Sequence, residues 1–282
     1  MTDIQHLPEI ARQVRRDILR MVHRVSSGHP GGSLGCADYL TALYFQYMNH
    51  NPDNFDPKGN GEDVFVMSNG HISPVFYSVL ARSGYFPVDE LNTFRLLNTR
   101  LQGHPTTHEG LPGVRVATGS LGQGLSVAVG FALQKKLDGD KSRVFALTGD
   151  GELQEGQIWE ALMFAAHHKV DNLIVAVDFN KQQIDGSTGD VLGITEVKSR
   201  FASFGWTTLE MDGNDWDDIH RLLPKAMDQL GCEKPVVIIM KTEMGQGVDF
   251  MMGTHAWHGK APNDEQLENA LNQLPETQYG DY

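Results

Sequence analysis

The sequence predicts an α/β fold with a central, mainly parallel sheet. Four short apolar runs, at 64–67, 144–147, 173–177 and 235–240, alternate with segments whose apolar residues recur at helical spacing. No linker rich in Pro or Ser, internal repeat or low-complexity tract separates them. The chain has 282 residues, 40% of them hydrophobic, which is enough for a sizeable core. We therefore expect a single domain over residues 1–282, with 261–282 as its C-terminal tail.

The expected elements follow one another in a simple order. Helices are expected where apolar residues recur every three or four positions, and they cover 8–25, 36–48, 73–81, 122–137, 154–168, 216–230 and 263–274. Strands are expected where short apolar runs meet turn residues, and they cover 63–67, 144–147, 173–177, 207–211 and 235–240. Residues 50–62 form a polar loop, and a loop that ends at Ser33 contains His29.

The composition argues against several classes of protein. A formal net charge of −13 disfavours a nucleic-acid surface, because neutralising phosphates requires a basic stripe. Cys36 and Cys232 are too few for a disulfide scaffold or a cysteine-rich metal site, and we expect both to be unreactive thiols. No apolar run has signal-peptide character or membrane-spanning length. These features predict a cytoplasmic protein without a nucleic-acid or membrane partner.

The most informative segment is 143–180, where two expected strands each end at a polar residue. The run 144–147 leads to Gly-Asp-Gly at 149–151, and the run 173–177 leads to Asn180, with a helix between them. Because the crossover of such a βαβ unit is right-handed, Asp150 and Asn180 should emerge at the same carboxyl edge of the sheet. There they can offer oxygen ligands to a divalent cation, with a backbone carbonyl as a third, while the helix amino terminus faces a diphosphate.

Other interpretations of these residues remain open from the spacing alone. Gly-Asp-Gly by itself marks an ordinary turn in most sequences. Glu152 and Glu155 could serve as further metal ligands or as acid–base groups. A zinc site is disfavoured, because the adjacent His167 and His168 on a helix point in different directions. The complete pattern of strand, Gly-Asp-Gly, helix, strand and asparagine favours a magnesium-diphosphate site.

Six sequence blocks resemble a known family. They are SGHPGG at 27–32, MSNGH at 67–71, GHP at 103–105, TGSLGQG at 118–124, GDGELQEG at 149–156 and HAWHG at 255–259. In this order they resemble the transketolases, which depend on thiamine diphosphate, and the likeness extends from about residue 12 to residue 260. The resemblance implies a three-layer α/β/α fold and the transfer of a two-carbon ketol unit from a ketose phosphate to an aldose phosphate.

The resemblance also assigns roles to individual residues. It implies thiamine diphosphate and Mg²⁺ as cofactors, with Ca²⁺ or Mn²⁺ as substitutes, and metal ligands at Asp150, Asn180 and the Gln182 carbonyl. In the family, the residue that matches Glu155 lies near a subunit interface and helps couple paired cofactor sites, whereas Glu152 matches a variable position and receives no role. The residues implied to bind the cofactor are His71, Gly119, Ser120, Leu121, Gly151, Glu155, Asn180 and His258.

Four of the twelve histidines stand in glycine- or proline-bounded loops, where active sites gather side chains from distant segments. An imidazole can bind a diphosphate oxygen, donate to a carbonyl or move a proton near neutral pH. By resemblance, His71 and His258 lie near the diphosphate, and His29 and His104 lie near substrate hydroxyls and the developing oxyanion. His29, His104 and His258 are the predicted catalytic residues, and the other eight histidines, apart from His71, are expected to be ordinary surface or hydrogen-bonded groups.

Transketolases normally continue into a pyrimidine-binding domain and a C-terminal domain, whereas this sequence stops at Tyr282. The resemblance therefore implies the N-terminal subunit of a split transketolase, inactive alone and assembled as α2β2 with a pyrimidine-domain subunit that acts on sugar phosphates. One alternative is another thiamine diphosphate enzyme, similar to deoxyxylulose-phosphate synthase or to a dehydrogenase E1 component. A second alternative is an orphan cofactor-binding module without catalysis. The SGHPGG, GHPT and WHG blocks favour transketolase, and the particular ketose and aldose stay open.

Overall fold

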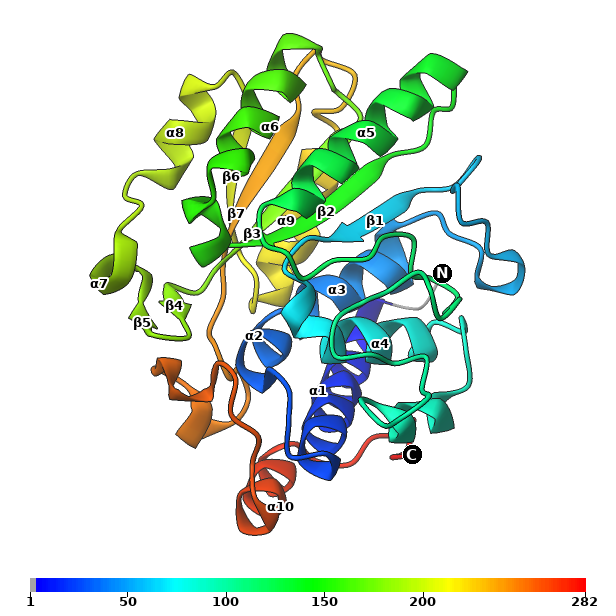
Figure 1. Ribbon diagram of the computed structural model, residues 1–282, viewed down its shortest axis with the longest axis vertical. Coiled ribbons are helices and arrows are strands. Elements are labelled where there is room, and N and C mark those ends of the chain that lie inside the picture. Colours follow the sequence, from blue (N-terminus) through cyan, green and yellow to red (C-terminus); the bar gives the residue numbers. More distant parts are fainter. Residues whose placement is uncertain (1–3) are drawn as a thin grey trace.

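A five-stranded parallel sheet forms the centre of the computed structural model, which describes residues 4–282 (Figure 1). Every neighbouring pair of strands is parallel. The strands in their spatial order are β1 (Val64–Met67), β2 (Val144–Gly149), β3 (Leu173–Phe179), β7 (Val236–Lys241) and β6 (Thr207–Asp212). The predicted α/β class and parallel sheet are confirmed, and the strand limits differ from the expected ones by one or two residues.

Helices cover both faces of this sheet and give the predicted three layers (Figure 1). The core on one face is built by α1 (Leu7–Arg24), α2 (Pro30–Gly35), α3 (Ala37–Ala42), α4 (Ser73–Arg82) and α9 (Trp216–Met227). The core on the other face is built by α5 (Gln123–Asp138), α6 (Gly156–His167) and α8 (Val197–Ser203). Within residues 4–282, no helix is both long enough and apolar enough to cross a membrane.

The apolar runs of the sequence are continuous because both faces of the sheet are covered. Successive side chains of a strand point to opposite faces. In β2, Phe145 and Leu147 join the core under α1–α4, whereas Val144 and Ala146 join the core under α5 and α6. A strand buried on both sides therefore has no polar alternation, as the sequence indicates.

Two expectations for residues 26–48 are wrong. Residues 30–35, which lie mostly in the expected loop, form α2, so that His29 directly precedes a helix. Pro30 suits a first helical position, and a Cβ on Gly31 would lie 2.6 Å from Met244 Cγ. Close packing on the 244 region thus permits a helix from a sequence of low helix propensity. The expected helix 36–48 is instead α3 followed by a π-helical turn, Leu43–Tyr47.

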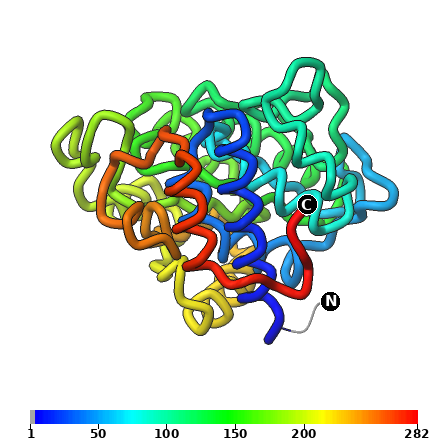
Figure 2. Tube along the Cα trace, turned by 90° about the horizontal axis from the view of Figure 1, so that it is seen from below, coloured from blue at the N-terminus to red at the C-terminus, as the bar shows by residue number. Residues whose placement is uncertain are grey.

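Smaller elements complete the fold. A hairpin of β4 (Gln182–Gln183) and β5 (Gly186–Ser187) follows β3, and α7 (Thr188–Leu192) follows the hairpin. The sequence did not indicate α7 or α8, because each is short and α8 buries only Val197 and Phe201. The expected helix in the C-terminal tail is present as α10 (Asp264–Gln273), which lies beside α1 (Figure 2).

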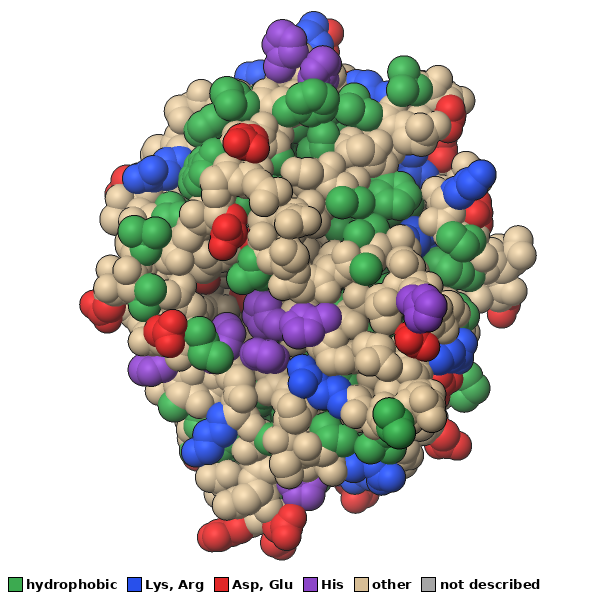
Figure 3. All heavy atoms as spheres, viewed as in Figure 1, with side chains coloured by type: hydrophobic (Ala, Val, Ile, Leu, Met, Phe, Trp, Pro, Cys, Tyr) green, Lys and Arg blue, Asp and Glu red, His purple; other side chains and the backbone are tan. Residues whose placement is uncertain are grey.

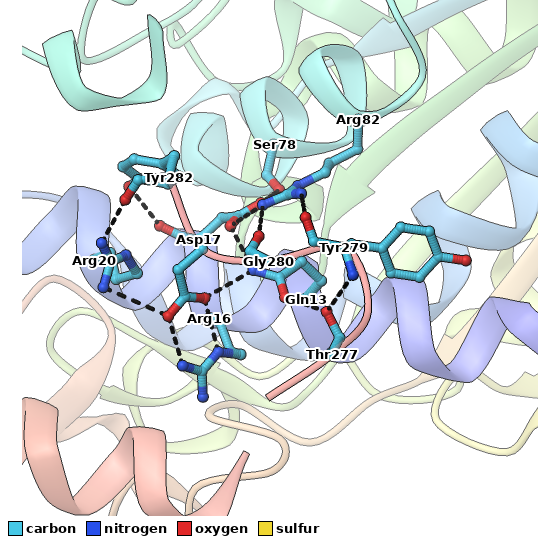
Figure 4. Close-up of polar contacts among 11 residues, drawn as sticks. Gln13, Arg16, Asp17, Arg20, Ser78, Arg82, Thr277, Tyr279, Gly280 and Tyr282 are labelled. Carbon is cyan, nitrogen blue, oxygen red and sulfur yellow. Dashed lines mark hydrogen bonds and ion pairs between the residues drawn. The ribbon is translucent and has the colours of Figure 1, made fainter. Parts of the chain in front are cut away.

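The segment after α10 joins α1 to α4 through buried polar contacts (Figure 4). The fully buried Asp17 carboxylate accepts two hydrogen bonds of 2.8 Å from Arg82 and one of 2.8 Å from Ser78. Arg16 pairs with Asp281 at 2.6 Å, and Arg82 also donates to the carbonyl of Gly280 at 2.9 Å. A buried carboxylate is tolerated when it is paired and hydrogen-bonded in this way. The tail therefore contributes to the packing of the helical layer.

The contact between α5 and β1 gives a prediction with a matched control. A Cβ on Gly124 would lie 2.6 Å from Ser68 Cα, whereas Gly130 on the same helix has no atom within 4 Å of its Cβ position. We expect Gly124→Ala to lower the free energy of unfolding by about 1–3 kcal/mol through overpacking. Gly130→Ala should raise it by up to about 1 kcal/mol through helix propensity. Urea denaturation measures both, and equal effects of the two substitutions would contradict the close approach of α5 to β1.

Candidate active site

The carboxyl edge of the sheet opens into a cavity of about 460 Å³. Gly149 of β2 is paired in register with Asp178 of β3, and the Asp150 backbone N–H donates to the Asp178 carbonyl at 3.1 Å. The structure thus brings Asp150 and Asn180 to the same edge, as the βαβ argument predicts. Of the predicted site residues, those that line the cavity are His29, His71, Gly119, Leu121, Asp150, Gly151, Glu155, Asn180, Gln182 and His258.

Asp150 is a buried carboxylate held by backbone donors. It accepts hydrogen bonds from the N–H groups of Gly151 at 2.7 Å and Lys181 at 2.5 Å. Burial, and then the neighbouring Asp178 carboxylate, raise the pKa of Asp150 to about 7. Two acidic groups in a dry environment disfavour each other's ionised form. A divalent cation bound here would favour the ionised carboxylate, so the residues fit a metal site.

Asp178 and Asn180 form the second part of this edge. The Asn180 side chain donates from Nδ2 to Asp178 Oδ2 at 2.9 Å, and its Oδ1 accepts from the Gln182 N–H at 2.9 Å. Asp178 in turn accepts from the Thr242 hydroxyl and from the buried Cys36 thiol. These contacts fix the orientation of the Asn180 amide. Sequence reasoning missed Asp178, which looks like an ordinary polar residue near the end of an apolar strand.

The candidate metal set has one carboxylate, one side-chain amide and one backbone carbonyl. Among the residues that the structure describes, no group of three or more His, Cys, Asp or Glu side chains is arranged to hold a metal ion. Asp150, Asn180 and the Gln182 carbonyl differ from such a group, because only one of the three is a titratable side chain. A site of this composition leaves positions for phosphate oxygens and water, as Mg²⁺ prefers.

Three histidines meet on one side of the cavity, and Figure 3 shows histidine side chains gathered near the centre of this face. The ring centroids of His29 and His71 are 5.1 Å apart, those of His71 and His258 are 5.2 Å apart, and those of His29 and His258 are 5.5 Å apart. Burial and the neighbouring imidazoles lower the pKa of His29 to about 4 and that of His71 to about 3. Both rings are therefore neutral near pH 7.

Some polar atoms of this group have no protein partner. The Nδ1 atoms of His29 and His258 are buried and form no hydrogen bond. The backbone around His29 is nevertheless fixed, since its carbonyl accepts from Ser33 Oγ at 2.7 Å. Buried polar atoms without partners are costly. Their concentration around one cavity is consistent with a polar ligand.

His104 lies apart from this group and does not line the cavity. It rests on Gly119, whose Cβ position would be 2.6 Å from His104 Cδ2 and whose φ of +132° suits glycine. Arg95 links its loop to that of His29, donating to Ser27 Oγ at 3.0 Å and to the Gly103 carbonyl at 3.4 Å. Burial, followed by the Arg95 charge, lowers the pKa of His104.

Glu152 has a structural position that the sequence did not indicate. It is buried, and its carboxylate accepts from the N–H groups of Gly122 at 2.8 Å and Gly149 at 3.0 Å and from the Ser68 hydroxyl. Burial raises its pKa. Its side chain thus joins the ends of β1 and β2 to the turn before α5. Only tertiary contacts reveal this role, because Glu152 stands in a polar turn of the sequence.

The remaining predicted residues lie at the margin of the cavity. Glu155 is exposed at its rim, where a Cβ on Gly122 would lie 2.7 Å from Glu155 Cβ. Ser120 is exposed and faces a neighbouring hollow with Thr118 and Gln123. The glycines of the 122–124 turn pack against protein atoms, so their backbone does not face the cavity as a platform for a flat ring.

Comparisons with known proteins identify the family. The model for the thiamine diphosphate-binding domain of transketolase matches residues 8–278. The chain belongs to the transketolase family. It is 39% identical to one of the two kinds of chain named for the apulose-4-phosphate transketolase of Phocaeicola vulgatus, over 93% of this chain and 91% of that protein. It is 37% identical to a 6-deoxy-6-sulfo-D-fructose transketolase subunit of a Clostridium species, over 96% of this chain and 96% of that protein.

Solved structures agree with this membership. The chain superposes on transketolase from Campylobacter jejuni with a TM-score of 0.89 and 37% sequence identity, covering 97% of this chain and 43% of that chain. Transketolase from Leishmania mexicana gives a TM-score of 0.88 at 31% identity, with 42% of that chain covered. The predicted family and three-layer fold are therefore confirmed. This transketolase-family chain spans less than half the length of these solved relatives.

The buried histidines give a prediction about pH. In the unfolded chain they take up protons near their ordinary pKa of 6.5, whereas in the folded chain His29 and His71 do so only near pH 4 and pH 3. The unfolded state thus binds more protons in this range, and the free energy of unfolding should fall as pH decreases from about 6.5 towards 4. One such proton corresponds to roughly 1.4 kcal/mol per pH unit.

Urea denaturation between pH 4.5 and 7.5 measures this dependence. His29→Gln should make the free energy of unfolding less dependent on pH than in the wild type. His167→Gln, which changes an exposed histidine of α6, is the matched control and should leave the slope unchanged. Identical slopes for His29→Gln and the wild type would show that His29 is protonated freely in the folded protein.

Proposed function

We propose that this chain is the thiamine diphosphate-binding subunit of a split transketolase. Together with a pyrimidine-domain subunit, it would transfer a two-carbon ketol unit from a ketose phosphate to an aldose phosphate. The observation that carries the proposal is one cavity lined by Asp150, Asn180 and three histidines at the carboxyl edge of the sheet. Three relatives of similar length are named as transketolase subunits, which supports a separate partner chain.

In this proposal the cavity holds the diphosphate end of the cofactor. Asp150, Asn180 Oδ1 and the Gln182 carbonyl hold Mg²⁺, or Ca²⁺ or Mn²⁺ in its place, and that ion offsets the charge of the diphosphate. Thiamine diphosphate supplies, when bound, the carbon nucleophile and the electron sink that sugar cleavage needs. The groups facing the cofactor are His71, Gly151, Asn180 and His258 at the diphosphate, Gly119, Ser120 and Leu121 at the aminopyrimidine ring, and Glu155 towards the paired site.

The neutral histidines suit proton transfer and hydrogen bonding at the substrate. A neutral imidazole has one donor and one acceptor nitrogen, so His29 can donate to a substrate oxygen or accept its proton. His104, on the neighbouring loop, would bind a substrate hydroxyl. His29 contacts the rings of both His71 and His258, so the substrate side and the diphosphate side of the cavity adjoin at His29.

The partner would dock beside the cavity, on the outer face of α5 and α6. Large apolar side chains on these helices are exposed, with exposed fractions of 82% for Leu137, 59% for Met163, 47% for Phe164 and 39% for Val127. A soluble chain rarely leaves such a group uncovered without an interaction to bury it. The adjoining rim residue Glu155 connects this face to the cavity. The α2β2 stoichiometry and the cytoplasmic location are part of the same proposal.

The alternatives are less well supported. A deoxyxylulose-phosphate synthase-like or dehydrogenase E1-like subunit would share the domain, but the named relatives and solved neighbours are transketolases. An orphan module released from catalysis would not need four loop histidines beside a metal-competent edge. The substrate is open. The names of relatives and of one solved complex suggest apulose 4-phosphate, 6-deoxy-6-sulfofructose and xylulose 5-phosphate as a first panel of donors.

Complementation tests the proposal. The chain alone should be folded but inactive, and mixing it with a pyrimidine-domain subunit encoded nearby should restore cofactor binding and ketol transfer together. Asp150→Ala in the mixture should abolish metal-dependent cofactor binding, because it removes the anionic ligand. Calorimetry and a coupled ketol-transfer assay measure these outcomes. Full activity of the chain alone, or undiminished cofactor affinity in Asp150→Ala, would refute the split enzyme or the metal site respectively.

The substrate-side histidines give a separate test in the assembled complex. His29→Ala and His104→Ala should reduce turnover by about 10²- to 10³-fold, a typical effect of losing one such hydrogen-bonding group. Their cofactor affinity should change much less, whereas His71→Ala should weaken it. Calorimetric titration beside steady-state kinetics separates the two effects. An equal loss of cofactor binding in all three variants would assign His29 and His104 to the diphosphate.

A further inference from the structure

Asn69 is a buried polar residue without a hydrogen-bond partner. It directly follows Ser68 at the carboxyl end of β1, it is 0% exposed, and it lines the same cavity as Asp150. Neither its Oδ1 nor its Nδ2 atom forms a hydrogen bond. Although it precedes the 3₁₀ turn Gly70–Ile72, its side chain does not cap that turn. The amide therefore has no function in the local backbone structure.

Such a residue is energetically unfavourable in the protein alone. A buried donor or acceptor that lost its water without gaining a partner costs free energy, and an apolar side chain of the same shape would avoid that cost. Buried polar groups in native proteins are almost always satisfied by protein, water or a ligand. The unsatisfied amide of Asn69 therefore calls for a group outside the chain.

The neighbouring buried polar residues behave differently. Ser68 donates to Glu152, and Ser73 donates to the Gly103 carbonyl at 2.8 Å. Ser78, further along α4, donates to Asp17 at 2.8 Å. These polar side chains between β1 and α4 thus have partners within the chain, in contrast to Asn69, which faces the cavity.

The surroundings of Asn69 indicate which ligand it meets. Its Cβ lies 3.9 Å from the Cβ position of Gly149, the residue before Asp150. On its other side, Gly70 packs against the 118–119 backbone, with a Cβ position 2.7 Å from the Thr118 carbonyl carbon. Asn69 thus lies on the floor of the cavity beside the end of β2. A diphosphate offers only acceptors, and an asparagine offers two N–H donors without adding charge.

We propose that Asn69 binds the cofactor and that its Nδ2 donates to an oxygen of the diphosphate. This inference rests on the proposed function, because it assumes a diphosphate in the cavity. The orphaned amide is then satisfied only in the loaded complex. Asn69 lowers the stability of the chain alone and strengthens cofactor binding. The trade between stability and binding is the property that distinguishes a ligand-binding residue from a structural one.

The stability of the chain without cofactor gives the first measurement. Asn69→Leu, of similar shape, and Asn69→Ala both remove the amide. We expect at least one of them to match or exceed the wild type in urea midpoint, because an unsatisfied group is lost. Ser68→Ala is the comparison, since it removes a bonded hydroxyl and should lower the midpoint. If both Asn69 variants lose as much stability as Ser68→Ala, Asn69 has partners within the protein and the proposal is wrong.

Cofactor binding gives the second measurement, in the complex with the partner subunit. Calorimetry with thiamine diphosphate and Mg²⁺ should show affinity at least about tenfold weaker in both Asn69 variants, the size of one hydrogen bond to a charged group. The matched control is Asn172→Ala, which changes another asparagine with an unpartnered Oδ1, placed before β3 at the opposite edge of the sheet. Its affinity should equal that of the wild type.

The outcomes separate this inference from the function on which it rests. Wild-type affinity in both Asn69 variants would mean that a water molecule satisfies the amide, which overturns the inference and leaves the proposed function intact. A wild-type complex that does not bind thiamine diphosphate at all would remove the proposed function and this inference together. Weaker binding without loss of stability supports Asn69 as a cofactor-binding residue.

Discussion

The parallel pairing of β2 with β3 determines the site, because it buries two carboxylates side by side at the carboxyl edge. Their backbones are joined from Asp150 N–H to the Asp178 carbonyl, and burial raises the pKa of both side chains. The arrangement costs free energy in the chain alone, since like charges in a dry environment oppose ionisation. A bound cation would reverse that cost. The orientation of Asn180 depends on the same pair, through its hydrogen bond to Asp178.

The electrostatics of the cavity differ from those of the whole protein. The chain carries a formal charge of −13, yet the proposed ligand is a polyanion. The cavity offers neutral donors in its histidines, whose burial keeps them uncharged, and a carboxylate edge suited to a metal ion. Affinity for a diphosphate would then depend on the cation and on directed hydrogen bonds, because attraction to the protein as a whole is unfavourable.

Local patterns predicted the parts of the fold that depend on neighbouring residues. The parallel strands, the helix between β2 and β3, and the convergence of Asp150 with Asn180 follow from periodicity and the handedness of βαβ units. The structure also gathers His29, His71 and His258, which the sequence singled out by their loops. Long-range contacts were beyond the sequence. Glu152, Asp178 and Asn69 owe their importance to partners, or to missing partners, on distant segments, and α2 forms because the 244 region packs on Gly31.

Glu152 explains how the cavity and the proposed docking face can act as one unit. Its carboxylate holds the turn before α5 to the ends of β1 and β2, and the same turn packs against Glu155 at the rim. A partner that buries the exposed apolar side chains of α5 and α6 would press on this turn directly. Since Gly119 and Leu121 lie just before it, docking and the positioning of the aminopyrimidine end of a cofactor are mechanically connected. A separate partner chain could thereby complete the site while leaving the metal-binding edge, fixed by the sheet, unchanged.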